Sequence, residues 1–410
     1  MRRCIIMLKF QKNYFKYLII GFLITAIMTL FIEGNQLLAA KGLVEIPQEQ
    51  GLSAQLRVKV RNFLLYSKIS HLATSVIDNK SYQTRKDLEE KAVKLLSGSR
   101  FSGLNIDKSS LISDIGYKGG RVYLNLSNQI YKLNVFEHFL IIESLVKLFA
   151  DISGVEDIQF LIGGHKGKLS SHLDIVRPIK VRKDNAQIAI IIDDFGNRAE
   201  GTDDILKLKQ RITCAIIPFK DDSTEEGKYA QKLGFDVIIH LPMESELDRP
   251  NWMGIKPILT TLSNEEIRSR MEEAIADIPN AIGFNNHTGG KATADKRVMH
   301  VLLEVAKERG LVAIDSRTTP KTVVAQVGKE IGVKVLERDI FLDHKKDYAY
   351  IREAMLNLAG RAIVRGKAIG IGHVGPHGGN VTALVLKNLL DPIEDAGVDF
   401  VGISSLINSK

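Results

Sequence analysis

The stretch Ile188-Ala-Ile-Ile-Ile192, followed directly by Asp193-Asp194, decides the fold class of this chain. An apolar run of this length, rich in Ile, predicts a strand that is buried on both faces, as strands of parallel sheets are. Four further apolar runs in the second half of the chain end in the same way, before His240, Asn285-Asn286-His287, Asp315 and His373. Polar residues at the carboxyl ends of parallel strands form the active sites of α/β proteins. The pattern therefore predicts an α/β enzyme.

Strand-like and helical runs alternate from residue 187 to residue 410. Three further strand candidates, 211–217, 333–336 and 400–403, join the five runs above, which gives eight strands. Repeated strand and helix units with right-handed crossovers produce a parallel sheet, either an open doubly wound sheet or a barrel. The count of eight favours a (β/α) barrel that is incomplete or distorted.

The composition is that of a folded protein of two domains or more, with 410 residues of which 45% are hydrophobic. The formal net charge is +8, but residues 1–40 carry five basic residues against one acidic residue, so half of the excess lies there. The remainder of the chain shows no basic stripe of the kind that binds nucleic acid. We therefore expect no nucleic-acid partner.

Residues 1–40 have the pattern of a targeting segment. A basic start precedes the uncharged run 17–32, and the small residues of Leu37-Leu-Ala-Ala40 follow. This order is typical of a secretory signal, and the run is also close to the length of a membrane anchor. A buried core helix is the alternative, but the basic flank argues against it. We expect an extracytoplasmic protein, secreted or anchored to the membrane, with a linker at 41–54.

Residues 55–176 predict a small α+β domain, and 177–186 predict the linker to the barrel. The run 121–126 alternates like a half-buried strand, and 136–152 has helical spacing of its apolar residues. The domain is similar to the GerMN domain of sporulation and germination proteins in three segments: Val122-Tyr-Leu-Asn-Leu-Ser127, Glu143-Ser-Leu-Val146 and Gly154-Val155-Glu-Asp-Ile158. This resemblance implies an extracytoplasmic module that binds an envelope protein or assists assembly.

The residues at the strand ends have the chemistry of a metal site. Two histidines and an aspartate that converge from separate strands would form an open three-ligand site of the zinc-enzyme type. Five of the ten histidines lie at or just beyond the predicted strand ends, at His240, His287, His344, His373 and His377. The alternative for Asp194 is a helix cap, and His300 is interpreted as a core histidine.

Residues 187–410 resemble the divergent polysaccharide deacetylase family, which is related to the NodB-type carbohydrate esterases. Six segments in the family's order support the resemblance: 190–196, His240-Leu-Pro-Met-Glu244, 283–287, Asp315-Ser-Arg317, Arg338-Asp-Ile-Phe-Leu-Asp343 and 368–373. The resemblance implies a distorted (β/α) barrel. It also implies a metal-dependent hydrolase that removes N-acetyl groups from a cell-wall or spore polysaccharide.

The resemblance also implies a role for each site residue. The metal ligands would be Asp194, His240 and His287, and the expected metal is a divalent ion, with zinc as the first choice. Asp193 would be the general base that takes a proton from the attacking water. His373 would be the acid that protonates the departing amine, and Asp315 and Arg317 would orient it or tune its charge.

The chain also departs from the family pattern. Glu244 stands where the related esterases have a second metal histidine, Thr288-Gly-Gly290 replaces Met-Gly-Ser, and Val374 replaces a proline after His373. These departures leave open whether Glu244 joins the metal set and whether His373 or His377 faces the metal. Asp343 and His344 are interpreted as loop residues. Two alternatives follow, a catalytically silent glycan-binding or assembly module and a metal-dependent amidase.

Overall fold

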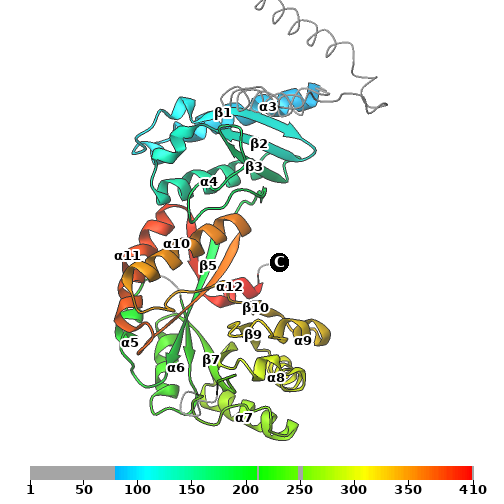
Figure 1. Cartoon of the computed structure of the whole chain (residues 1–410), viewed down its shortest axis with the longest axis vertical. Helices are drawn as coiled ribbons and strands as arrows, with labels where there is room; N and C mark the ends of the chain where they lie inside the picture. The colour runs from blue at the N-terminus through cyan, green and yellow to red at the C-terminus, as the bar shows by residue number, and fades with distance from the viewer. Residues whose placement is uncertain (1–78, 210–211, 248–252, 409–410) are drawn as a thin grey trace, which may run out of the picture. The chain divides into compact units, whose positions relative to one another are not determined.

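The computed structural model describes residues 79–209, 212–247 and 253–408 (Figure 1). All of them belong to one compact unit. The predicted signal or anchor at 1–40, the linker at 41–54 and the first part of the predicted α+β domain lie outside the described residues. Among the described residues, no helix is both long and apolar enough to cross a membrane.

A small α+β domain precedes the barrel. Its elements are α3 (Asn79–Leu96), β1 (Ile112–Lys118), β2 (Arg121–Leu126), α4 (Val135–Ala150), β3 (Asp157–Ile162) and β4 (Ile179–Lys180). The sheet order is β1-β2-β3-β4, and only the β2–β3 pair is parallel. The helix α4 begins with a capping box formed by Asn134 and Glu137, which satisfies backbone donors at its first turn.

Residues 177–186, which the sequence predicted to be a linker, are held by contacts with the small domain and lead directly into the barrel. Residues 179–180 form β4 of the small sheet. Arg182 forms an ion pair with Glu143 of α4, whose carboxylate is buried. Oε1 of Glu143 also accepts a hydrogen bond of 2.9 Å from the backbone N–H of Ala186, the first residue of the barrel strand β5 (Ala186–Phe195). The small domain is therefore attached directly to the strand that carries Asp193 and Asp194.

The described residues of the second half of the chain form a parallel, curled sheet of nine strands with helices outside it, which confirms the prediction of a distorted (β/α) barrel (Figure 1). Its strands after β5 are β6 (Thr213–Ile216), β7 (Asp236–Met243), β8 (Gly283–Thr288), β9 (Val312–Asp315), β10 (Val335–Glu337), β11 (Ile340–Phe341), β12 (Lys367–His373) and β13 (Val398–Val401). Its helices are α5 (Thr202–Ile205), α6 (Ser223–Lys232), α7 (Asn264–Asp277), α8 (Lys296–Glu308), α9 (Val324–Ile331), α10 (Tyr348–Arg365), α11 (Gly379–Asp395) and α12 (Ile403–Asn408).

The barrel is open between β10 and β11. The order β10-β9-β8-β7-β6-β5-β12-β11 places these two strands at opposite edges, and β13 pairs with β5. The eight predicted strands are all present. The ninth, β11, has only two residues, which is too short to produce an apolar run.

Side chains alternate between the interior and the helices along each barrel strand. Ala189 and Ile191 of β5 belong to a small inner cluster, together with Ile369 and Ile371 of β12. The intervening residues of β5, such as Ile190, belong to the large core shared with the helices. Ile403 and Leu406 of α12 also belong to the inner cluster. Apolar side chains therefore fill the barrel interior below the strand ends.

Gly360 allows the small domain to approach α10 closely. A Cβ atom at this position would lie 1.8 Å from the backbone oxygen of His172. Gly-to-Ala in a helix interior normally stabilises a protein by about 1 kcal/mol. Here the backbone must move, and overpacking typically costs about 1–3 kcal/mol.

We predict that Gly360→Ala lowers the free energy of unfolding by about 2 kcal/mol, because an approach of 1.8 Å puts the overpacking cost at the upper end of its range while the helical preference offsets about 1 kcal/mol. Chemical denaturation of the full chain measures it. Gly103→Ala is the control, because a Cβ there meets nothing within 4 Å. An unchanged or raised stability of Gly360→Ala would show that the two segments do not meet as described.

Candidate metal centre and catalytic site

Polar side chains occupy the interior positions where the apolar filling of the barrel ends. Asp193 follows Ala189 and Ile191 on the inner face of β5, and His373 follows Ile371 on β12. The Cα atoms of Asp193 and His373 are register partners on neighbouring parallel strands. His240 lies two residues after the inner Ile238 of β7. The alternation that fills the barrel thus also gathers the predicted site residues at its carboxyl end.

Asp194, His240 and His287 form a compact cluster of possible metal ligands. Oδ1 of Asp194 lies 3.4 Å from Nε2 of His240 and 3.2 Å from Nδ1 of His287, and the two ring nitrogens are 3.0 Å apart. Within the described part of the chain this is the one group of three or more such residues. It unites the three ligands predicted from the sequence.

The donor set fits a divalent metal ion. Oδ1 of Asp194 is buried and accepts no well-aligned hydrogen bond from the described residues. Burial alone would raise the pKa of Asp194, but His240 and His287 outweigh it and lower that pKa well below its usual range. A carboxylate that stays charged and two imidazoles are the ligands of open zinc sites.

Asn285 connects the cluster to the proposed base. Its carbonyl oxygen accepts a hydrogen bond of 2.7 Å from Nδ1 of His240, and its amide donates one of 2.8 Å to Oδ1 of Asp193. Because Nδ1 of His240 donates, the neutral ring presents the lone pair of Nε2 to the cluster. Sequence reasoning assigned no role to Asn285, although it lies in the Asn-Asn-His run.

Asp193 is a buried carboxyl group beside the cluster. It is 1% exposed, and this burial raises its pKa above the ordinary range. A carboxylate with a raised pKa binds a proton more readily, which suits a general base.

Glu226 of α6 fixes the loop that follows Asp194. Its buried carboxylate accepts a hydrogen bond of 2.6 Å from the backbone N–H of Gly196 and a second one from that of Arg198. Glu226 lies within α6, 30 residues after Gly196, and not at the end of a strand. No local sequence pattern therefore indicated this role.

His373 is oriented by Asp343. Nδ1 of His373 donates a hydrogen bond of 2.8 Å to Oδ1 of Asp343, whose Oδ2 accepts from the backbone N–H of His373 and from the hydroxyl of Thr382. Burial lowers the pKa of His373, but the Asp343 carboxylate outweighs it and raises that pKa to about 9. His377 lies 5.6 Å from His373, measured between ring centroids.

The partner of His373 differs from the sequence expectation. Oδ1 of Asp315 accepts from the backbone N–H of Arg317, and Oδ2 accepts from the Thr322 hydroxyl. The side chain of Arg317 pairs with Glu337 at the surface. The expected orienting role of Asp315 and Arg317 therefore belongs to Asp343, because the Asp315 carboxylate is used within its own loop.

Glu244 is separate from the cluster. Its Oε2 accepts hydrogen bonds of 2.6 Å from the backbone N–H and the hydroxyl of Thr260, and its Oε1 pairs with Lys291 at 2.6 Å. Glu244 thus connects the loops around the site rather than joining the three candidate ligands.

These features define a class, the open parallel (β/α) barrels with an Asp-His-His cluster that could hold a metal ion at the carboxyl end of the sheet. Residues 190–407 match the family described as divergent polysaccharide deacetylase, and the chain belongs to this family.

Two curated relatives are uncharacterized proteins. One, from Haemophilus influenzae, is 32% identical over 213 residues, which are 52% of this chain and 75% of that protein. The other, YibQ of Escherichia coli, is 30% identical over 222 residues, which are 54% and 67% of the two chains. A solved structure of an uncharacterized protein from Agrobacterium tumefaciens is similar with a TM-score of 0.51 and 19% identity, over 54% of this chain and 89% of that one. This last similarity shows the fold alone.

We predict that Asn285→Leu weakens Zn²⁺ binding about 10–100-fold, because the side chain keeps its approximate size but loses the group that orients His240. Competition with a chelating dye measures the affinity. Asn388→Leu, at an exposed site on α11, is the matched control. Equal affinities of the Asn285 variant and the unchanged protein would remove Asn285 from the site.

We predict that Asp343→Asn moves the pKa of His373 from about 9 down toward its ordinary value of 6.5 in the metal-free protein. The raised pKa means that the His373–Asp343 pair stabilises the fold fully below about pH 6.5 and loses this contribution as the pH rises through about 9. The variant should therefore lose stability at pH 6 and little at pH 10. NMR titration and denaturation at both pH values test this, and an unmoved His373 pKa would contradict it.

Proposed function

We propose that the protein is an exported, metal-dependent hydrolase that removes N-acetyl groups from a cell-wall or spore-envelope polysaccharide. The observation that carries this proposal is the Asp194–His240–His287 cluster, placed beside the buried Asp193 and beside His373 in a member of the deacetylase family. Membership of the family supports a carbohydrate substrate and a hydrolytic reaction, and the cluster supports a divalent metal, which we propose to be zinc.

Asp193 and His373 lie beside the cluster, and each carries out one proton transfer of amide hydrolysis. A divalent cation bound there supplies Lewis acidity, which polarises a carbonyl group and makes water more acidic. Asp193 accepts the proton of the water that adds to the acetamide carbon, and the amide of Asn285 keeps its carboxylate in place. His373, protonated at neutral pH, donates a proton to the nitrogen as the C–N bond breaks. Acetate and a free amine leave.

The remaining parts of the chain support an envelope location. The predicted signal or anchor at 1–40 provides the route of export. The GerMN-like sequence of 55–176 supports binding of an envelope protein partner. Glu143 of the small domain accepts a hydrogen bond from Ala186, the first residue of β5. A partner bound to the small domain would therefore be held close to the barrel.

The test is acetate release from N-acetylglucosamine oligomers and from peptidoglycan, with Zn²⁺ added to the purified protein. Asp193→Asn should keep its metal but lose about 10²–10⁴-fold in kcat, because it removes the base and leaves the ligands. Asp194→Ala should lose metal and activity together. Asp203→Asn changes an exposed carboxylate on α5 and is the control.

Three outcomes separate the candidate functions. Acetate release that depends on Asp193 supports the deacetylase. Release of peptide in place of acetate identifies an amidase. Metal-loaded, folded protein that releases neither product from any substrate contradicts the proposed hydrolytic function.

A further inference from the structure

A cleft of about 1130 Å³ lies next to the catalytic strand ends. One wall is a face of α10 with residues three to four positions apart, and the opposite wall is β11 with the residues that flank it. The third wall is the segment 168–177 of the small domain, which is fixed on α10 by the close approach at Gly360 and by a contact of 2.5 Å between His172 and Glu353. The cleft is therefore a feature of the folded unit.

The cleft meets the candidate catalytic site at Phe341. The ring of Phe341 lines the cleft and stacks on the ring of His373, with 5.7 Å between centroids and 28° between planes. The guanidinium of Arg338, another lining residue, lies 3.7 Å from the centroid of the same ring. Phe341 therefore borders both the cleft and the side chain of His373.

The lining of the cleft has an excess of positive charge. Three acidic residues line it, and two of these are paired, Asp339 with Arg365 at 2.7 Å and Glu353 with His172. The Lys and Arg residues of the lining are Lys168, Arg177, Arg338, Arg361 and Arg365. The walls therefore carry more cations than their own carboxylates neutralise.

Four of these cations, all except Arg365, form no ion pair with a carboxylate of the described chain, and Arg361 donates to the backbone oxygen of Asp339. Arg338 donates to the backbone oxygens of Ser316 and Arg317, and burial lowers its pKa to about 10. Lys168 and Arg177 are exposed on the third wall, the segment 168–177, and form no ion pair with a described residue. Cations that line one concave surface attract an anionic ligand and increase its association rate.

We propose that this cleft binds an anionic group, a carboxylate or a phosphate, of the same glycan strand whose acetamide enters the catalytic site. The inference rests on the proposed function and narrows its substrate to an acidic polysaccharide.

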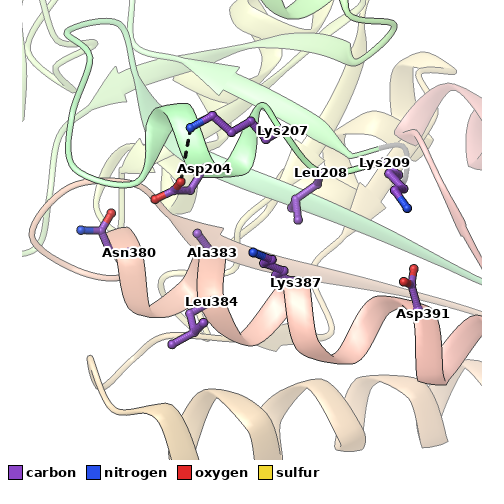
Figure 2. A pocket seen from close by; sticks show the side chains of 9 residues that line it. All are labelled: Asp204, Lys207, Leu208, Lys209, Asn380, Ala383, Leu384, Lys387 and Asp391. Carbon is purple, nitrogen blue, oxygen red and sulfur yellow. Dashed lines mark ion pairs between the residues drawn. The ribbon is translucent and has the colours of Figure 1, made fainter.

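A second hollow provides a matched control (Figure 2). It has about 650 Å³, lies along α11, and contains none of the predicted site residues. Its lysines include Lys209 and Lys387, while Lys207 pairs with Asp204 at 3.6 Å. Lys209→Glu/Lys387→Glu therefore changes the net charge as much as Lys168→Glu/Arg177→Glu does, but outside the cleft.

The experiment measures the dissociation constants of labelled oligogalacturonate, poly(glycerol phosphate), chitohexaose and duplex DNA. All proteins carry Asp193→Asn, so that binding is independent of turnover. Lys168→Glu/Arg177→Glu should weaken binding of an anionic glycan polymer about tenfold, in a salt-dependent manner, and leave chitohexaose unchanged. The tighter anionic polymer identifies the group, carboxylate or phosphate.

Equal losses in the two double variants would assign the effect to net charge and overturn the proposal. Binding of chitohexaose as tight as that of both anionic polymers, or binding of DNA tighter than either, would also overturn it. Acetate release is measured separately, on the protein that retains Asp193. If that protein releases acetate but the Lys168→Glu/Arg177→Glu variant shows no change in anion binding, the cleft is refuted and the deacetylase stands. Anion binding that depends on Lys168 and Arg177, without acetate release by the protein that retains Asp193, would refute the deacetylase and leave the cleft.

Discussion

The left-handed backbone of Asp194, with φ of 74°, is the constraint on which the candidate site depends. Neighbouring residues of a strand point to opposite faces, so Asp193 and Asp194 could not both face the barrel mouth in a regular strand. The turn at Asp194 brings its carboxylate to His240 and His287 while Asp193 stays on the inner face. This conformation costs about 1–2 kcal/mol in a residue other than glycine, although Asp tolerates it better than most.

The surrounding structure compensates for that cost. The buried carboxylate of Glu226 binds two backbone N–H groups in the loop directly after Asp194, and such bonds to a charged group contribute about 1.5–3 kcal/mol each. Below the site, the apolar inner cluster fills the barrel, so the strand ends rest on a rigid base. The site is thus preorganised by packing beneath it and by hydrogen bonds from outside it.

The sequence predicted those parts of the site that depend on local pattern. Apolar runs ending in Asp193-Asp194, His240 and His287 predict a parallel sheet with ligands at one edge, because strand periodicity and burial leave a local signal. Asn285 contacts Asp193 across 92 positions, and Asp343 contacts His373 across 30. No spacing rule connects such pairs, since the fold alone sets their distance. Asp315 lies at a strand end, as the other predicted site residues do. The sequence therefore predicted for Asp315 the contact with His373 that Asp343 makes in the structure.

Anomalous scattering from crystals of the full chain grown with Zn²⁺ tests the central claim most directly. The account predicts one strong peak at the zinc edge, about 2.0–2.2 Å from Oδ1 of Asp194, Nε2 of His240 and Nδ1 of His287. Asp193 should lie beside the ion without coordinating it. A peak coordinated by other residues, or no peak at these three atoms in zinc-saturated crystals, would contradict the account.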